Sequence, residues 1–69
     1  MPKSTEEMRY IAQSHSIREK RDMLLVNSDW TQVADAPVDQ TAWATYRQAL
    51  RDITAQNGFP NEVTWPVEP

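Results

Sequence analysis

Residues 40–57 carry the strongest helical pattern in the chain, and their apolar face most constrains the fold. At about 100° per residue, one sector roughly 120° wide collects the apolar side chains Ala42, Trp43, Tyr46, Ala49, Leu50 and Ile53. Asp39 is a typical N-cap, and Asn57 and Gly58 followed by Pro60 indicate the end. The pattern predicts an α-helix over residues 39–57 with one face to bury.

The small size of the chain limits the core that can cover this face. A single core in 69 residues rarely supplies more than about 3–5 kcal/mol without a disulfide, a metal or a partner. The chain has no cysteine, and His15 is its only histidine. A disulfide and an ordinary zinc site are therefore excluded, and we predict no metal and no cofactor. The expected source of extra stability is a partner, either another protein or a second copy in a homo-oligomer.

Composition also excludes several functional classes. The net charge is −3 and no basic stripe is present, which argues against nucleic acid and anionic membrane surfaces as partners. No apolar run approaches the roughly 18 residues of a membrane span, so a soluble, intracellular protein is expected. Gly58 is the only glycine, which excludes a glycine-rich phosphate loop. We predict that the chain is not an enzyme.

The first 27 residues read as helical in two ways. Ser4 with Glu7, and Ser16 with Glu19, are both capping-box patterns. Either residues 1–15 form an arm before a helix over 16–27, or one helix runs from about residue 5 and overhangs its partner helix. We favour the continuous helix, because the segment is rich in good helix formers. Its apolar residues lie on two opposite sides: Met8, Ile11, Ala12 and His15 on one, and Tyr10, Ile17 and Leu24 on the other.

The loop and the tail each contain a tryptophan. The loop over residues 28–38 is long for a helix–helix connection, and we predict that Trp30 is buried and anchors it, the alternative being an exposed indole. Prolines prevent a helix over residues 58–69. We expect this extended tail to fold back so that Trp65 packs near the first helix. The alternative is a free tail that offers WPVEP to a partner as a proline-rich ligand.

These expectations combine into one domain over residues 1–69. The predicted fold is all-α: a two-helix antiparallel hairpin with a long tryptophan-anchored loop and an extended, proline-rich C-terminal tail. The predicted core consists of Leu24, Trp30, Trp43, Tyr46, Leu50 and Ile53. Aromatic residues and arginine dominate binding hot spots. The predicted partner-facing residues are Met8, Tyr10, Ile11, Arg47 and Trp65.

Three stretches of the chain form a recognisable set: RDMLLVNSDWTQVADAPVD (residues 21–39), WATYRQALRDI (43–53) and GFPNEVTWPVEP (58–69). Together they resemble the tail assembly chaperone family of tailed bacteriophages. The second half is also similar to the C-terminal end of tail-fibre assembly proteins. The chain departs from the family pattern at two places. Val33-Ala34 stands where Leu-Pro is usual, and Thr54-Ala55 where a proline often occurs.

The resemblance implies a non-enzymatic chaperone that binds phage tail or tail-fibre proteins and assists their folding or assembly in the host bacterial cytoplasm. It leaves open whether the chain departs after assembly or stays in the virion tail. Two alternatives follow: a permanent small structural component of the tail or fibre, and a phage-encoded binder of a host protein.

Overall fold

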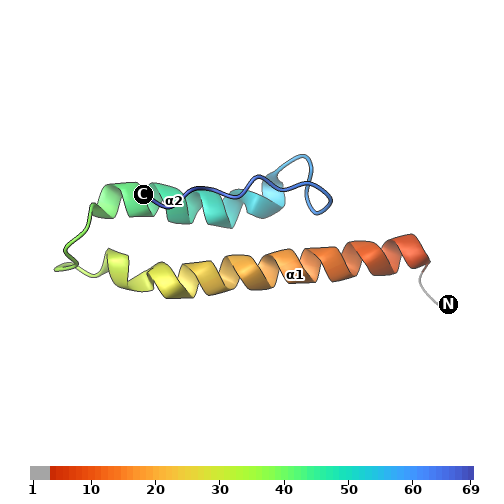
Figure 1. Ribbon diagram of the computed structural model, residues 1–69, viewed down its shortest axis with the longest axis horizontal. Helices are drawn as coiled ribbons and strands as arrows, with labels where there is room; N and C mark the ends of the chain where they lie inside the picture. The colour runs from red at the N-terminus through yellow and green to blue at the C-terminus, as the bar shows by residue number, and fades with distance from the viewer. Residues whose placement is uncertain (1–3) are drawn as a thin grey trace.

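The computed structural model describes residues 4–69, and over this range the chain is all-helical with no strand. It contains two α-helices, α1 (Thr5–Ser28) and α2 (Gln40–Arg51), and two short 3₁₀ helices, η1 (Asp29–Gln32) and η2 (Asp52–Ala55). Helices α1 and α2 lie side by side and run in opposite directions, and the molecule is elongated, with extents of 53 × 19 × 13 Å (Figure 1). The all-α prediction is confirmed.

Helix α1 is a single continuous helix, so a break near Ser16 is not present. It begins where the Ser4 hydroxyl accepts a 3.1 Å hydrogen bond from the Glu7 backbone N–H, which satisfies one of the free N–H groups of the first turn. The buried and partly buried side chains of α1, such as Ser14, Ile17 and Leu24, share the side facing α2. The N-terminal end of α1 extends beyond α2 (Figure 1).

Helix α2 begins as the sequence predicts but ends at Arg51 rather than at Asn57. The Asp39 carboxylate accepts a 3.1 Å hydrogen bond from the Ala42 backbone N–H and caps the first turn. After Arg51 the chain tightens into η2, a common ending for an α-helix. The chain then turns, because the Gln56 side-chain amide donates to the Thr64 carbonyl (2.8 Å) and accepts from the Thr64 N–H (2.9 Å). This pairing ties the start of the turn to the tail.

The core lies between α1, α2 and the tail. Leu50 and Ile53 are fully buried and Tyr46 nearly so. Seven partly buried side chains pack around them: Ile17, Leu24, Leu25, Trp43, Phe59, Val63 and Trp65. With so few fully buried apolar side chains, each contributes a large share of the folding free energy.

The tail turns back at Gly58 and runs along α2 toward the start of that helix (Figure 1). The Glu62 N–H donates to the Gly58 carbonyl at 2.7 Å. A Cβ at Gly58 would lie 2.4 Å from the Glu62 carbonyl oxygen, so this tight turn requires glycine. Residues 63–69 form neither helix nor strand. Trp65 lies partly buried against the core, with the Lys20 ammonium 4.3 Å from its ring centroid.

Ionisation of the buried Tyr46 is predicted to lower the stability of the fold at alkaline pH. Burial raises the pKa of its phenol above the ordinary 10.0, and the negative charge of Glu68 raises it further. The folded state thus holds this proton more tightly than the unfolded state. We expect the associated stability to be complete below about pH 10 and to fall by up to about 1.4 kcal/mol per pH unit above it. Urea denaturation of the wild type and Tyr46→Phe near pH 8 and pH 11 checks this. If the free energy of unfolding falls equally in both proteins between pH 8 and pH 11, the prediction is contradicted.

Candidate protein-binding site

Large exposed apolar side chains lie in three regions of the described chain. One more exposed side chain, Val67, lies apart from them on the tail. At the loop end of the hairpin, Trp30 and Val33 are about half exposed. At the opposite, open end, Tyr10 is 53% exposed. Along α1, on the side away from α2, are Met8, Ile11, Met23 and Val26. Exposed apolar and aromatic groups are the usual contacts of protein interfaces.

Trp30 is 50% exposed, so the prediction that it is a buried anchor is wrong. Its ring lies 6.4 Å from that of Trp43, tilted by 51°, and Trp43 in turn meets Tyr46 edge-on at 5.6 Å. Trp30 therefore covers the edge of an aromatic row instead of entering the core. We call Trp30, Val33 and the partly buried Trp43 the loop-end surface. The fully buried residue of this loop is Thr31, whose hydroxyl donates to the Ser28 carbonyl at 2.6 Å.

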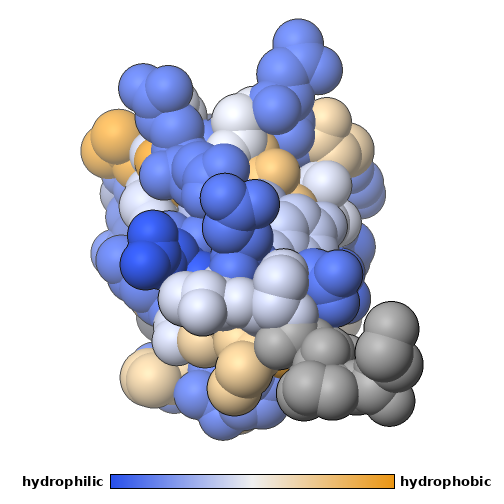
Figure 2. All heavy atoms as spheres, turned by 90° about the vertical axis from the view of Figure 1, so that its right-hand side faces the viewer, coloured by the Kyte–Doolittle hydropathy of each residue, from blue (hydrophilic) through white to orange (hydrophobic). Residues whose placement is uncertain are grey.

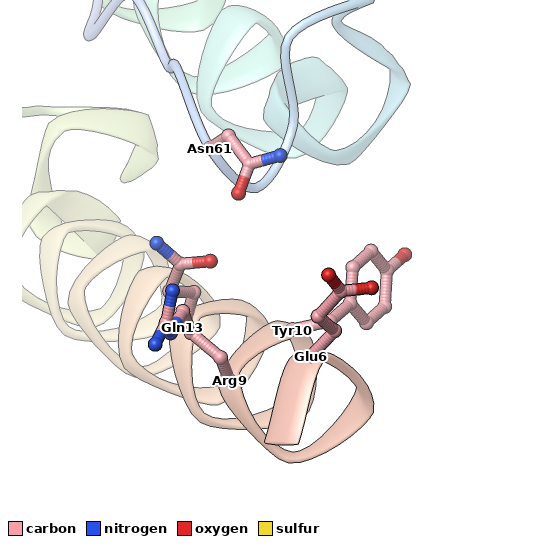
Figure 3. Close-up of a pocket in the computed structure, with 5 residues that line it drawn as sticks. All are labelled: Glu6, Arg9, Tyr10, Gln13 and Asn61. Carbon is pink, nitrogen blue, oxygen red and sulfur yellow. The ribbon is translucent and has the colours of Figure 1, made fainter. Parts of the chain in front are cut away.

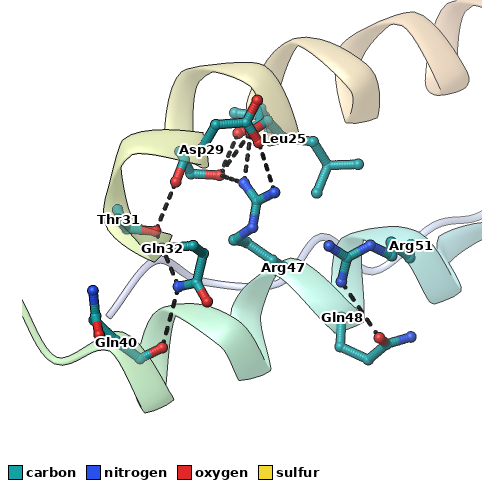
Figure 4. A network of polar contacts seen from close by, with 10 residues as sticks. Leu25, Asp29, Thr31, Gln32, Gln40, Arg47, Gln48 and Arg51 are labelled. Carbon is teal, nitrogen blue, oxygen red and sulfur yellow. Dashed lines mark hydrogen bonds and ion pairs between the residues drawn. The ribbon is translucent and has the colours of Figure 1, made fainter. Parts of the chain in front are cut away.

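Arg47, predicted to face a partner, is instead buried and bound within the chain (Figure 4). One terminal nitrogen, Nη1, donates to the Leu25 carbonyl (2.6 Å) and the Ser28 hydroxyl (2.7 Å). The other, Nη2, donates to Asp29 Oδ1 at 2.6 Å. The last turn of α1 has no basic residue of its own. The guanidinium supplies both the positive charge and the donors that the free carbonyls of a helix C-terminus require.

Further polar contacts tie the loop to the start of α2. The Gln32 side chain donates to the Gln40 carbonyl at 3.2 Å (Figure 4). The Gln40 side chain in turn donates to the Val33 carbonyl. Both ends of the segment that carries Trp30 and Val33 are therefore fixed. A fixed loop loses little conformational entropy when a partner binds it.

The open end contains a shallow hollow of about 290 Å³. Four of its residues are on α1 (Glu6, Arg9, Tyr10 and Gln13), and Asn61 lies across from them on the turn (Figure 3). In the view onto this end, hydrophobic groups form small spots separated by hydrophilic side chains (Figure 2). The hollow therefore offers mixed polar contacts around a single aromatic ring.

The other predicted contact residues fall into two groups. Met8, Tyr10 and Ile11 are exposed on the N-terminal half of α1. Trp65 is only partly exposed and packs against the core. Val33 was not predicted as a contact residue. Its position three residues after Trp30 in the same loop is the signal that could have identified it.

Residues 4–69 lack two kinds of feature, a membrane-spanning helix and a cluster of metal ligands. None of the helices there is long and apolar enough to cross a membrane. Within the same residues, the His, Asp and Glu side chains form no group of three or more that could hold a metal ion.

Comparison with known protein families identifies a match over most of the chain. The family model described as "Phage tail assembly chaperone protein" matches residues 14–69, which include the C-terminal half of α1, the loop, α2 and the tail. No curated protein and no solved structure matches the chain. Residues 14–69 are well over half of the sequence, and they include both the loop-end surface and the buried Arg47. The chain therefore belongs to the phage tail assembly chaperone protein family.

Proposed function

We propose that this chaperone binds an unassembled tail or tail-fibre subunit through the loop-end surface and holds it ready for assembly in the host cytoplasm. The role is one of binding, without a chemical step. The observation that carries the proposal is a half-exposed tryptophan on a loop fixed at both ends. A tryptophan in such a setting has the properties of a binding hot spot.

The surroundings of Trp30 support this assignment. Its ring rests on Trp43, so part of its surface is already desolvated and its orientation is set. Arg47 fixes the end of α1 from which the loop starts. A subunit that buried the free half of the indole would gain apolar burial at little ordering cost.

Binding would also stabilise the chaperone. A ligand that binds only the folded state raises its stability by RT ln(1 + [L]/Kd), which is about 2.7 kcal/mol at a hundred times Kd. This is comparable with the few kcal/mol expected from a core of this size. A small fold of this kind can therefore rely on its client for part of its stability.

Trp30→Ala is expected to abolish capture of the client while leaving the fold intact. The experiment is co-expression of the tagged chain with neighbouring tail and tail-fibre proteins of the same phage, followed by affinity pull-down. Val67→Ala is the matched control, because Val67 is 88% exposed and lies on the tail. Circular dichroism of each variant checks folding. Undiminished capture by the folded Trp30→Ala protein would contradict the proposal.

The same proposal predicts that the chain is absent from finished particles. Quantitative proteomics of purified virions is expected to find it far below the level of the tail subunits. A stoichiometric amount would instead favour a permanent structural component.

A further inference from the structure

The outer face of α1, the side turned away from α2 and the tail, is uncovered over most of its length (Figure 1). It consists of eight exposed residues: Met8, Ile11, Ala12, His15, Glu19, Asp22, Met23 and Val26. Its four large apolar side chains are 45–67% exposed. Two of them lie near the N-terminus of α1 and two near its C-terminus, with charged groups between.

Six of these residues follow the spacing of a coiled-coil seam. Met8, Ala12, His15, Glu19, Asp22 and Val26 are separated alternately by four and three residues, the heptad spacing at which one helix contacts another along its length. Inside the molecule this seam has no partner, because α2 lies on the opposite side of α1.

The seam is also symmetric about its centre. Met8 and Val26 are equally far from Ile17, as are Ala12 and Asp22, and His15 and Glu19. An antiparallel second copy would therefore place Met8 against Val26, Ala12 against Asp22, and His15 against Glu19. A twofold axis near Ile17 generates each of these pairs twice, which is the self-complementarity that a symmetric dimer needs.

Charge decides between the two possible orientations. A parallel pair would set Glu19 against Glu19 and Asp22 against Asp22, which is unfavourable. The antiparallel pair sets Glu19 against His15, the two residues that already pair within one helix at 3.0 Å. It also sets Asp22, whose carboxylate is held by Arg21 at 2.9 Å, against the small Ala12.

We propose that the outer face of α1 binds a second copy of this chain in an antiparallel dimer. The proposal is independent of the client-binding site. At about 1.5 Å per residue, the two loop-end surfaces would start roughly 36 Å apart, at opposite ends of the dimer. The dimer would thus present two free client sites.

Engineered cysteines test the register directly, because the chain has no cysteine of its own. Met8→Cys and Val26→Cys are prepared separately, and both sites are exposed enough to tolerate the change. In the antiparallel dimer, identical cysteines would lie about 27 Å apart, beyond the reach of a disulfide. Mild oxidation of either variant alone should give no disulfide-linked product. The equimolar mixture should give a disulfide-linked heterodimer. Self-linking of Met8→Cys alone, or no product from the mixture, would overturn the proposal.

Sedimentation of the wild-type chain over a range of concentrations tests self-association without cross-linking. We expect a concentration-dependent dimer whose dissociation constant rises at least about tenfold in Val26→Asp. Val67→Asp, on the exposed tail, is the matched control and should dimerise like the wild type. A wild-type chain that stays monomeric throughout, or a Val26→Asp protein that dimerises normally, would contradict the proposal. Client capture in the pull-down above is a separate readout, so the two proposals can fail independently.

Discussion

Leu50→Ala is expected to unfold most of the isolated protein near physiological temperature. Leu50 is fully buried and belongs to the small group of side chains that form the core between α1, α2 and the tail. Leu→Ala in a core costs about 2–5 kcal/mol, because burial is lost and a cavity remains. The whole stability expected for a core of this size is only about 3–5 kcal/mol. We therefore expect the variant to lose the near-ultraviolet circular dichroism of its ordered aromatic rings.

Val67→Ala is the control for this experiment. Val67 is also aliphatic but is 88% exposed on the tail, outside both proposed binding surfaces, so its truncation should change the free energy of unfolding by less than about 0.5 kcal/mol. Thermal melts and urea titrations of both variants, followed by near- and far-ultraviolet circular dichroism, give the comparison. A Leu50→Ala protein that melts with the wild type would show that the core is not where we place it.

The sequence predicts α2 well because its information is local. The spacing of Tyr46, Leu50 and Ile53 requires a single buried face at helical period, and the structure buries all three. The Asp39 cap depends on a contact only three residues away. The end of the helix was harder to predict, because α2 changes into the 3₁₀ helix η2 at Asp52 within the same apolar pattern. The Gln56–Thr64 pairing that ties the following turn to the tail joins residues eight apart, which no periodic pattern reveals.

The candidate site was less predictable because it depends on contacts between distant residues. Trp30 was expected to be buried because a small core needs large side chains, yet Leu50 and Ile53, with aliphatic neighbours from α1, fill the centre. Arg47 was expected to face a partner because an arginine next to Trp43 or Tyr46 can anchor an interface. One signal pointed the other way: a helix without a basic residue in its last turn, as α1 is, needs donors for its free carbonyls.

Arg47→Met is expected to destabilise the fold by about 2–4 kcal/mol. The substitution keeps most of the volume but removes three donated hydrogen bonds, to the Leu25 carbonyl, the Ser28 hydroxyl and Asp29 Oδ1. The cost should stay below that of a fully buried ion pair. The Asp29 carboxylate is 63% exposed, so water can solvate it once Arg47 is gone.

Arg51→Met is the matched control, because Arg51 is exposed on the same helix and its one side-chain contact, to Gln48, is a long 3.4 Å. It should change the unfolding free energy by less than about 0.5 kcal/mol. Arg47→Lys should recover only part of the loss, since one ammonium cannot reproduce the planar fork of the guanidinium. Urea titrations measure all three variants. Hydrogen exchange should also show faster opening of residues 29–33 in Arg47→Met, because the guanidinium joins α2 to the helix end from which that loop starts. Equal stabilities of the Arg47→Met and Arg51→Met proteins would contradict this role for Arg47.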